Sequence, residues 1–126
     1  MSEILALLIE DYEPHRKIIH RLVERGAVPL GRIIDEAESY ESGLSLIRSR
    51  AHESNVLFVD DQMPRNSLEQ TKLDFGSLLV AAYREVCPHG LVVIISSQNF
   101  GGGDRFIPKG LNTNEMVERM SSLIQG

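Results

Sequence analysis

The chain of 126 residues carries 42% hydrophobic and 25% charged residues, an ordinary composition for one globular domain over residues 1–126. Its single cysteine, Cys87, excludes an intramolecular disulfide and a cysteine-based zinc site, so we expect a reducing, cytoplasmic compartment. The net charge of −5 argues against nucleic-acid binding by this domain, because phosphate backbones favour clustered lysine and arginine. No apolar run is long enough to span a membrane, and we expect neither a membrane partner nor a secretory leader.

The N-terminal segment predicts a buried strand followed by a helix. Residues 4–9 are a continuous apolar run, typical of a strand that is buried on both faces of a parallel sheet. The acidic pair at 10–11 ends this run. Pro14 suits the first turn of a helix that begins near Glu13, and Gly26 is a suitable C-terminal glycine.

The next elements repeat this alternation. Residues 32–37 predict a weaker strand, and residues 40–50 have the apolar spacing of a helix. Residues 56–59 predict a third strand, which again ends in two acids, Asp60 and Asp61, before a Met-Pro pair at 63–64.

The second half begins with a polar segment at 65–72, which we expect to be irregular. A helix is then expected as far as about Val86, with Thr71 and Asp74 as its capping box. The apolar residues assigned to the buried face of this helix are Phe75, Leu78, Leu79, Ala82 and Val86.

Three more elements complete the chain. Residues 91–95 predict a strand buried on both faces, and residues 105–108 predict a short strand whose proline indicates a sheet edge. Asn112 and Glu115 are expected to cap a last helix. Strands that alternate with helices predict an α/β fold, an open parallel sheet with helices on both faces.

Three carboxylates are expected at one edge of this sheet. Glu10, Asp11 and Asp60 follow the first and third strands, and they meet if these strands are neighbours. Their mutual repulsion is most simply relieved by a hard divalent cation with oxygen ligands, such as Mg²⁺. Ser96 and Lys109 follow the later strands and add a hydroxyl and an ammonium group. Together these groups can stabilise phosphoryl transfer to an aspartate.

The order of these residues resembles the receiver domain of bacterial response regulators over nearly the whole chain. The matching positions are Glu10-Asp11, Asp60-Asp61-Gln62-Met63-Pro64, Ser96 and Phe106-Ile107-Pro108-Lys109. The resemblance implies a flavodoxin-like, doubly wound sheet of five parallel strands in the order 2-1-3-4-5. It also implies a signalling module in a two-component system, and not a turnover enzyme.

The resemblance also assigns roles to single residues. It implies that Asp60 accepts a phosphoryl group from a histidine kinase or a histidine phosphotransfer protein, in a reaction that needs Mg²⁺. The ligands of Mg²⁺ would be Glu10, Asp11, Asp60 and the backbone carbonyl of Gln62. Ser96 and Lys109 would bind the phosphoryl oxygens, and Phe106 would be the aromatic switch that changes binding to an output protein.

The sequence departs from this family at three places. Only residues 97–104 separate the fourth and fifth strands, so we expect the fourth helix to be missing or reduced to one turn. Residues 65–74 form an insertion beside Asp60, which is equally consistent with a lid, a partner site or a solvated loop. Gly110 follows Lys109 where the family has proline, so we expect a trans peptide bond there.

Other functions are weighed against the receiver. A pseudo-receiver would use the same fold as a phosphorylation-independent interaction module. A phosphatase of the haloacid dehalogenase type needs a second acid two residues after its nucleophile, where this chain has Gln62. A flavodoxin-like FMN site is disfavoured because the acids at 10–11 would repel phosphate. The glycines at 101–103 precede a predicted strand instead of the helix of a phosphate-binding loop, and the four histidines lack metal-ligand spacing.

Overall fold

The structure is a computed structural model that describes residues 3–25, 31–96, 103–110, 114–116 and 118–119. In chain order the elements are β1 (Ile4–Ile9), α1 (Glu13–Glu24), β2 (Gly31–Ala37), α2 (Tyr40–Arg50), the 3-10 turn η1 (Ala51–Glu53), β3 (Val56–Val59), β4 (Met63–Pro64), β5 (Lys72–Leu73), α3 (Gly76–Val86), β6 (Leu91–Ser96) and β7 (Arg105–Pro108).

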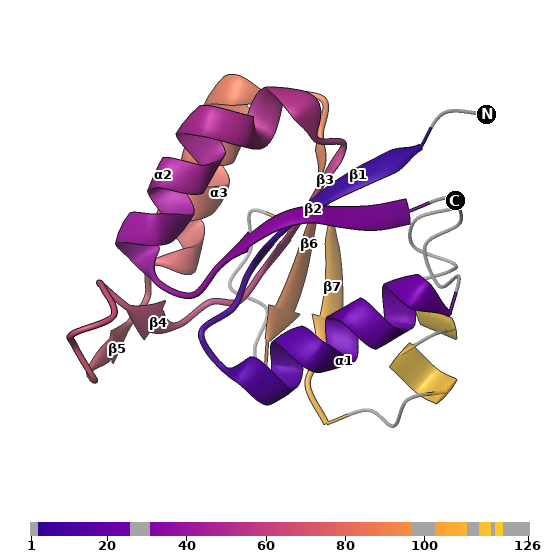
Figure 1. The fold of residues 1–126 in the computed structure, drawn as a ribbon, viewed down its shortest axis with the longest axis horizontal. Helices are drawn as coiled ribbons and strands as arrows, with labels where there is room; N and C mark the ends of the chain where they lie inside the picture. The colour runs from indigo at the N-terminus through magenta and orange to yellow at the C-terminus, as the bar shows by residue number, and fades with distance from the viewer. Residues whose placement is uncertain (1–2, 26–30, 97–102, 111–113, 117, 120–126) are drawn as a thin grey trace.

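The main sheet has five parallel strands in the order β2-β1-β3-β6-β7. This order is the predicted 2-1-3-4-5 order, because β6 and β7 are the fourth and fifth strands of the sheet. The prediction of an edge strand at 105–108 is also confirmed, since β7 pairs on one side only. Helices α2 and α3 cover one face of the sheet, and α1 covers the other (Figure 1).

The core lies in two layers, one on each face of the sheet. Successive residues of a strand alternate between the layers, so Leu8 packs toward α1 and Leu7 packs toward α2 and α3. In β3, Phe58 and Leu57 divide in the same way. All four of these side chains are buried. Burial on both faces explains why the central strands are continuous apolar runs.

The third helix differs from its prediction. Helix α3 begins at Gly76 and has no side-chain cap, so the proposed capping box of Thr71 and Asp74 is wrong. Its buried face was predicted correctly for Leu79, and Phe75 and Ala82 pack partly buried against the core, but Leu78 and Val86 are exposed. The residues of α3 that are buried are Gly76, Leu79, Val80 and Tyr83. Tyr83 reaches the core because its hydroxyl shares a hydrogen bond of 2.8 Å with the buried hydroxyl of Ser54.

The segment between β3 and α3 is more regular than predicted. Met63–Pro64 and Lys72–Leu73 pair as β4 and β5 in a two-stranded antiparallel hairpin. Met63 is fully buried against the α2–α3 layer, and the far part of the hairpin is exposed, with Leu68 92% accessible. The hairpin extends from the end of the molecule where α2 begins and β3 ends (Figure 1).

Several predicted features fall on residues outside the described ranges. The crossover between β6 and β7 comprises residues 97–104, and its described residues, Gly103 and Asp104, are not helical. Gly26 and Asn112, the predicted helix-ending and helix-capping residues, are not described. Residues 114–116 and 118–119 are helical, as expected for the last helix, and Met116 is buried in the α1 layer. Among the described residues, no helix has the length and apolar character that a membrane span requires.

Candidate functional site

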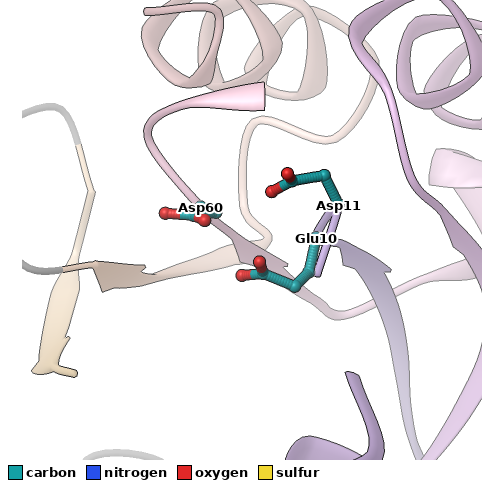
Figure 2. A group of neighbouring side chains, drawn as sticks. All are labelled: Glu10, Asp11 and Asp60. Carbon is teal, nitrogen blue, oxygen red and sulfur yellow. The ribbon is translucent and has the colours of Figure 1, made fainter. Parts of the chain in front are cut away.

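The three predicted carboxylates lie together at the carboxyl edge of the sheet. Glu10 and Asp11 follow β1, and Asp60 follows its neighbour β3 (Figure 2). The backbone pairing continues beyond the strands, since the amide of Asp60 donates to the carbonyl of Ile9 at 3.1 Å. One carboxylate oxygen from each of the three residues lies within 4.8 Å of the others. The parallel pairing of β1 and β3 therefore creates a compact acidic cluster, defined here as Glu10, Asp11 and Asp60.

The start of α3 fixes the loop that carries Asp60. The amide of Gly76 donates to the carbonyl of Asp61 at 2.9 Å, and the amide of Asp61 donates to Asp60 Oδ1 at 2.7 Å. A Cβ atom at Gly76 would lie 2.6 Å from the carbonyl oxygen of Asp60, which is closer than real Cβ contacts. The helix approaches the loop this closely only because residue 76 has no side chain.

Lys109 supplies a positive charge from the end of β7. Its Nζ lies 2.7 Å from Asp60 Oδ2 and 3.7 Å from Glu10 Oε2. Its amide donates to the carbonyl of Ser96 at 2.9 Å, which holds Lys109 beside the end of β6. No cis peptide bond occurs among the described residues, so the predicted trans bond before Gly110 is confirmed.

A second lysine, for which no role was predicted from the sequence, contacts the carboxylate of Asp11. Lys72 of β5 places its Nζ 2.8 Å from Asp11 Oδ2. The Asp11 side chain is 9% accessible and that of Lys72 is 50% accessible. Asp11 Oδ1 is buried and has no hydrogen-bond partner in the described part of the chain. An unpartnered buried carboxylate oxygen is unusual, and it suits a site that accepts a cation.

Burial and crowding alter the acidity of the cluster. Burial, a hydrogen bond to the side chain of Asp61 and the charge of Glu10 raise the pKa of Asp60 to about 8, although Lys109 opposes the shift. Burial also raises the pKa of Glu10, again against the effect of Lys109. The cluster therefore carries less negative charge than three free carboxylates would. A bound divalent cation would favour the ionised form of these acids, and carboxylate oxygens are the ligands that Mg²⁺ prefers.

The comparisons with known proteins agree with this arrangement, although no protein-family model matches the chain. It is 29% identical over 117 residues to the two-component response regulator ORR41 of Oryza sativa subsp. japonica, covering 90% of this chain and 88% of that protein. It resembles CheY in a CheX–CheY–BeF3–Mg²⁺ complex from Borrelia burgdorferi with a TM-score of 0.75 and 19% identity, over 95% of this chain and 88% of that one. It resembles the RcsB response regulator of Salmonella typhimurium with a TM-score of 0.75 and 14% identity, over 100% of this chain but only 63% of that one.

The chain has the CheY-like receiver fold. The recognition made from the motif order is therefore confirmed, as is the five-stranded flavodoxin-like sheet. Eight residues, 97–104, separate β6 from β7 in this chain.

The remaining predicted residues are Ser96, Phe106 and Gln62. Ser96 is fully buried at the end of β6 and forms a hydrogen bond with the Asp61 side chain. Burial alone would raise the pKa of Asp61, but its hydrogen bonds with Asp60 and Ser96 lower that pKa overall. Phe106 is half-buried on β7 against the α2–α3 layer. Gln62 donates its side-chain amide to Asp74 at 3.0 Å.

Two residues of α1 also contact the cluster, and no motif in the sequence predicted these contacts. Arg16 donates from Nη1 to the backbone carbonyl of Glu10 at 2.8 Å, which fixes the loop after β1. His15 Nδ1 lies 3.6 Å from Glu10 Oε1. Burial and the charge of Lys109 lower the pKa of His15. In the sequence, the one sign of this contact is the position of His15, four residues after Asp11, at the start of the helix that follows the acidic pair.

Proposed function

We propose that this chain is a two-component receiver that accepts a phosphoryl group on Asp60 and changes its binding to an output protein. The observation that carries the proposal is the ion pair of 2.7 Å between Asp60 and Lys109 inside the acidic cluster. A buried aspartate beside an ammonium group can act as a nucleophile whose product is stabilised by the same ammonium group. The likeness to ORR41 over most of both chains supports the same function.

The proposed donor is the phosphohistidine of a histidine kinase or a histidine phosphotransfer protein. A carboxylate oxygen of Asp60 attacks the phosphorus, and a P–O bond forms as the P–N bond breaks. The electron pair of the P–N bond returns to the imidazole, which then takes up a proton. Lys109 pairs with a phosphoryl oxygen of the product, and the Ser96 hydroxyl donates to another.

A bound Mg²⁺ would supply positive charge that keeps the carboxylates ionised and offsets the charge that develops on the phosphoryl oxygens. The proposed ligands are the carboxylates of Glu10, Asp11 and Asp60, together with the backbone carbonyl of Gln62. The buried, unpartnered Asp11 Oδ1 supports a cation at this place. Magnesium in the Borrelia burgdorferi CheY complex is consistent with the proposal.

The proposed output is a shift between two conformations. Ser96 leaves its hydrogen bond with Asp61 as it turns toward the phosphoryl group, and Phe106 moves into the space that this opens. Because the crossover before β7 is short, the surface that signals this change differs from that of receivers with a full fourth helix. We propose no turnover activity beyond self-dephosphorylation.

A pseudo-receiver is the second candidate, and the Lys72–Asp11 ion pair favours it. This pair, at 2.8 Å, compensates the charge of Asp11 without a metal ion. Such a molecule would bind its partner in the unphosphorylated state and would take up no phosphoryl group.

Phosphoryl uptake separates the two candidates. We would incubate the protein with acetyl phosphate, with and without Mg²⁺, and measure the intact mass of the wild type, Asp60→Asn and Asp61→Asn. The receiver function predicts one phosphoryl group, dependent on Mg²⁺, on the wild type and on Asp61→Asn but not on Asp60→Asn. No uptake by a folded wild type would refute this function and favour the pseudo-receiver.

A further inference from the structure

The insertion between β3 and α3 places a lysine at the acidic cluster. The hairpin of β4 and β5 pairs Pro64 with Lys72, so the lysine lies opposite the first strand of the hairpin. From there its ammonium group reaches Asp11 at 2.8 Å. Lys72 is the point at which the hairpin contacts the cluster, and the contact is made to a carboxylate that is 9% accessible.

The hairpin is fastened on its other side by contacts that do not involve the cluster. Arg65 accepts a hydrogen bond on its carbonyl from the amide of Glu41 at 2.9 Å, and its guanidinium lies 5.9 Å from the ring centre of Phe75. Phe75 in turn stacks on Tyr40 with ring centres 4.3 Å apart. These contacts hold the base of the hairpin against α2, and none of them involves Lys72.

Lys72 and a divalent cation are both positively charged, so they are alternative partners for the carboxylate of Asp11. Lys72 neutralises one oxygen of Asp11, while the other oxygen has no partner in the described part of the chain. A divalent cation held by Asp11 together with Glu10 and Asp60 would lie within a few ångströms of the ammonium group, since the three carboxylates are within 4.8 Å of one another. Two positive centres at such a distance repel one another, so both cannot be held by Asp11 at full strength.

We propose that Lys72 is a built-in competitor of Mg²⁺, which couples occupation of the cation site to the position of the β4–β5 hairpin. Without the cation, Lys72 holds the hairpin against Asp11. When the cation binds, the ammonium group is released into solvent, and the exposed part of the hairpin, residues 66–72, becomes free to move. The inference rests on the proposed function, because it assumes that the acidic cluster binds Mg²⁺.

The first test measures Mg²⁺ affinity by isothermal titration calorimetry. Lys72→Met removes the charge and keeps the apolar stem, and Lys72→Arg keeps the charge. The matched control is Arg32→Met. Arg32 forms an exposed ion pair with Glu3 near the start of β1, whereas the acidic cluster lies beyond the end of that strand. It removes the same unit of charge far from the cluster, where salt screens its effect.

We expect Lys72→Met to bind Mg²⁺ about fivefold more tightly than the wild type, which corresponds to a half-exposed ion pair of about 1 kcal/mol. Lys72→Arg and Arg32→Met should stay within about twofold of the wild type. Equal or weaker binding by Lys72→Met would overturn the inference while leaving the proposed function intact. If neither the wild type nor Lys72→Met bound Mg²⁺, the cation site of the proposed function would fail and the inference would fail with it.

The second test follows the hairpin directly by amide hydrogen exchange. In the wild type, saturating Mg²⁺ should speed exchange over residues 66–72, and in Lys72→Met this segment should exchange fast with or without the cation. The amide of Glu41, which donates to the hairpin base, should be unaffected. An exchange rate of the wild-type hairpin that Mg²⁺ leaves unchanged or slows would overturn the coupling.

Discussion

Asp60→Asn should stabilise the protein in a manner that depends on pH. The folded state raises the pKa of Asp60 from its ordinary value of 3.8 to about 8, so the folded protein holds this proton more strongly than the unfolded chain. The associated stability is fully present below about pH 4 and is lost as the pH rises toward 8. Asparagine resembles the protonated acid in shape and carries no charge, so the variant should not suffer this loss.

The expected change in the free energy of unfolding follows from the single proton that Asp60 binds in the folded state. Between pH 5 and pH 7 the folded wild type keeps the proton that the unfolded chain has released, so its stability falls by about 1.4 kcal/mol per pH unit. The advantage of Asp60→Asn should therefore grow by about 2.7 kcal/mol over this interval and should level off above pH 8. A divalent cation favours the ionised acid, so saturating Mg²⁺ should reduce the slope.

Urea unfolding in the presence of a chelator, followed by far-ultraviolet circular dichroism at several pH values, would measure this difference. Asp61→Asn is the matched control, because the pKa of Asp61 is lowered and its stabilising charge is present above pH 4 and lost as the pH falls. The stability of that variant relative to the wild type should therefore stay constant between pH 5 and pH 7. An advantage of Asp60→Asn that stays constant between pH 5 and pH 7 would show that Asp60 is ionised in the folded protein and that its pKa is not raised.

Three further substitutions test the charge at the site, the close approach of α3 and the hydrogen bonding of the core. Lys109→Met removes the ammonium group that pairs with Asp60, so at pH 8 the free energy of unfolding in urea should fall by about 3 kcal/mol. The same variant should take up no phosphoryl group, and unchanged uptake would exclude the lysine from the reaction. Gly76→Ala should destabilise by about 1–3 kcal/mol, since its Cβ would meet the Asp60 carbonyl; a gain in stability, the usual effect of alanine in a helix, would contradict this close approach. Tyr83→Phe removes the buried hydrogen bond to Ser54, so thermal unfolding should show a loss of about 1 kcal/mol, and no loss would mean that water replaces the hydroxyl.

The fold could be predicted wherever local sequence and tertiary packing act together. Residues 56–59 are apolar throughout, and both faces of β3 are buried, so the predicted bounds are those of the strand. Helix α2 has the predicted bounds because Ser39 caps it and its apolar residues face the sheet. The strand ends determine the acidic cluster, since parallel pairing of β1 and β3 brings their carboxyl ends to one edge.

The insertion could not be predicted in this way. The polar residues at 65–74 have no apolar periodicity, and β5 consists of only two exposed residues. The other strand of the hairpin, β4, is placed by Met63, which is buried in the α2–α3 layer through tertiary contacts that no local pattern shows. For the same reason no local pattern distinguished Lys72 from other surface lysines. Its contact with Asp11 arises from the path of the hairpin and not from a motif.

The most direct test of the central claim is to locate the phosphoryl group on the chain. After incubation with acetyl phosphate and Mg²⁺, borohydride reduction would convert an acyl phosphate of aspartate to homoserine, and peptide mass spectrometry would show its position. The receiver function predicts homoserine at Asp60 alone, with none at Asp11 or Asp61. A phosphoryl group on any other residue, or none on a folded protein that binds Mg²⁺, would show that Asp60 is not the phosphoacceptor.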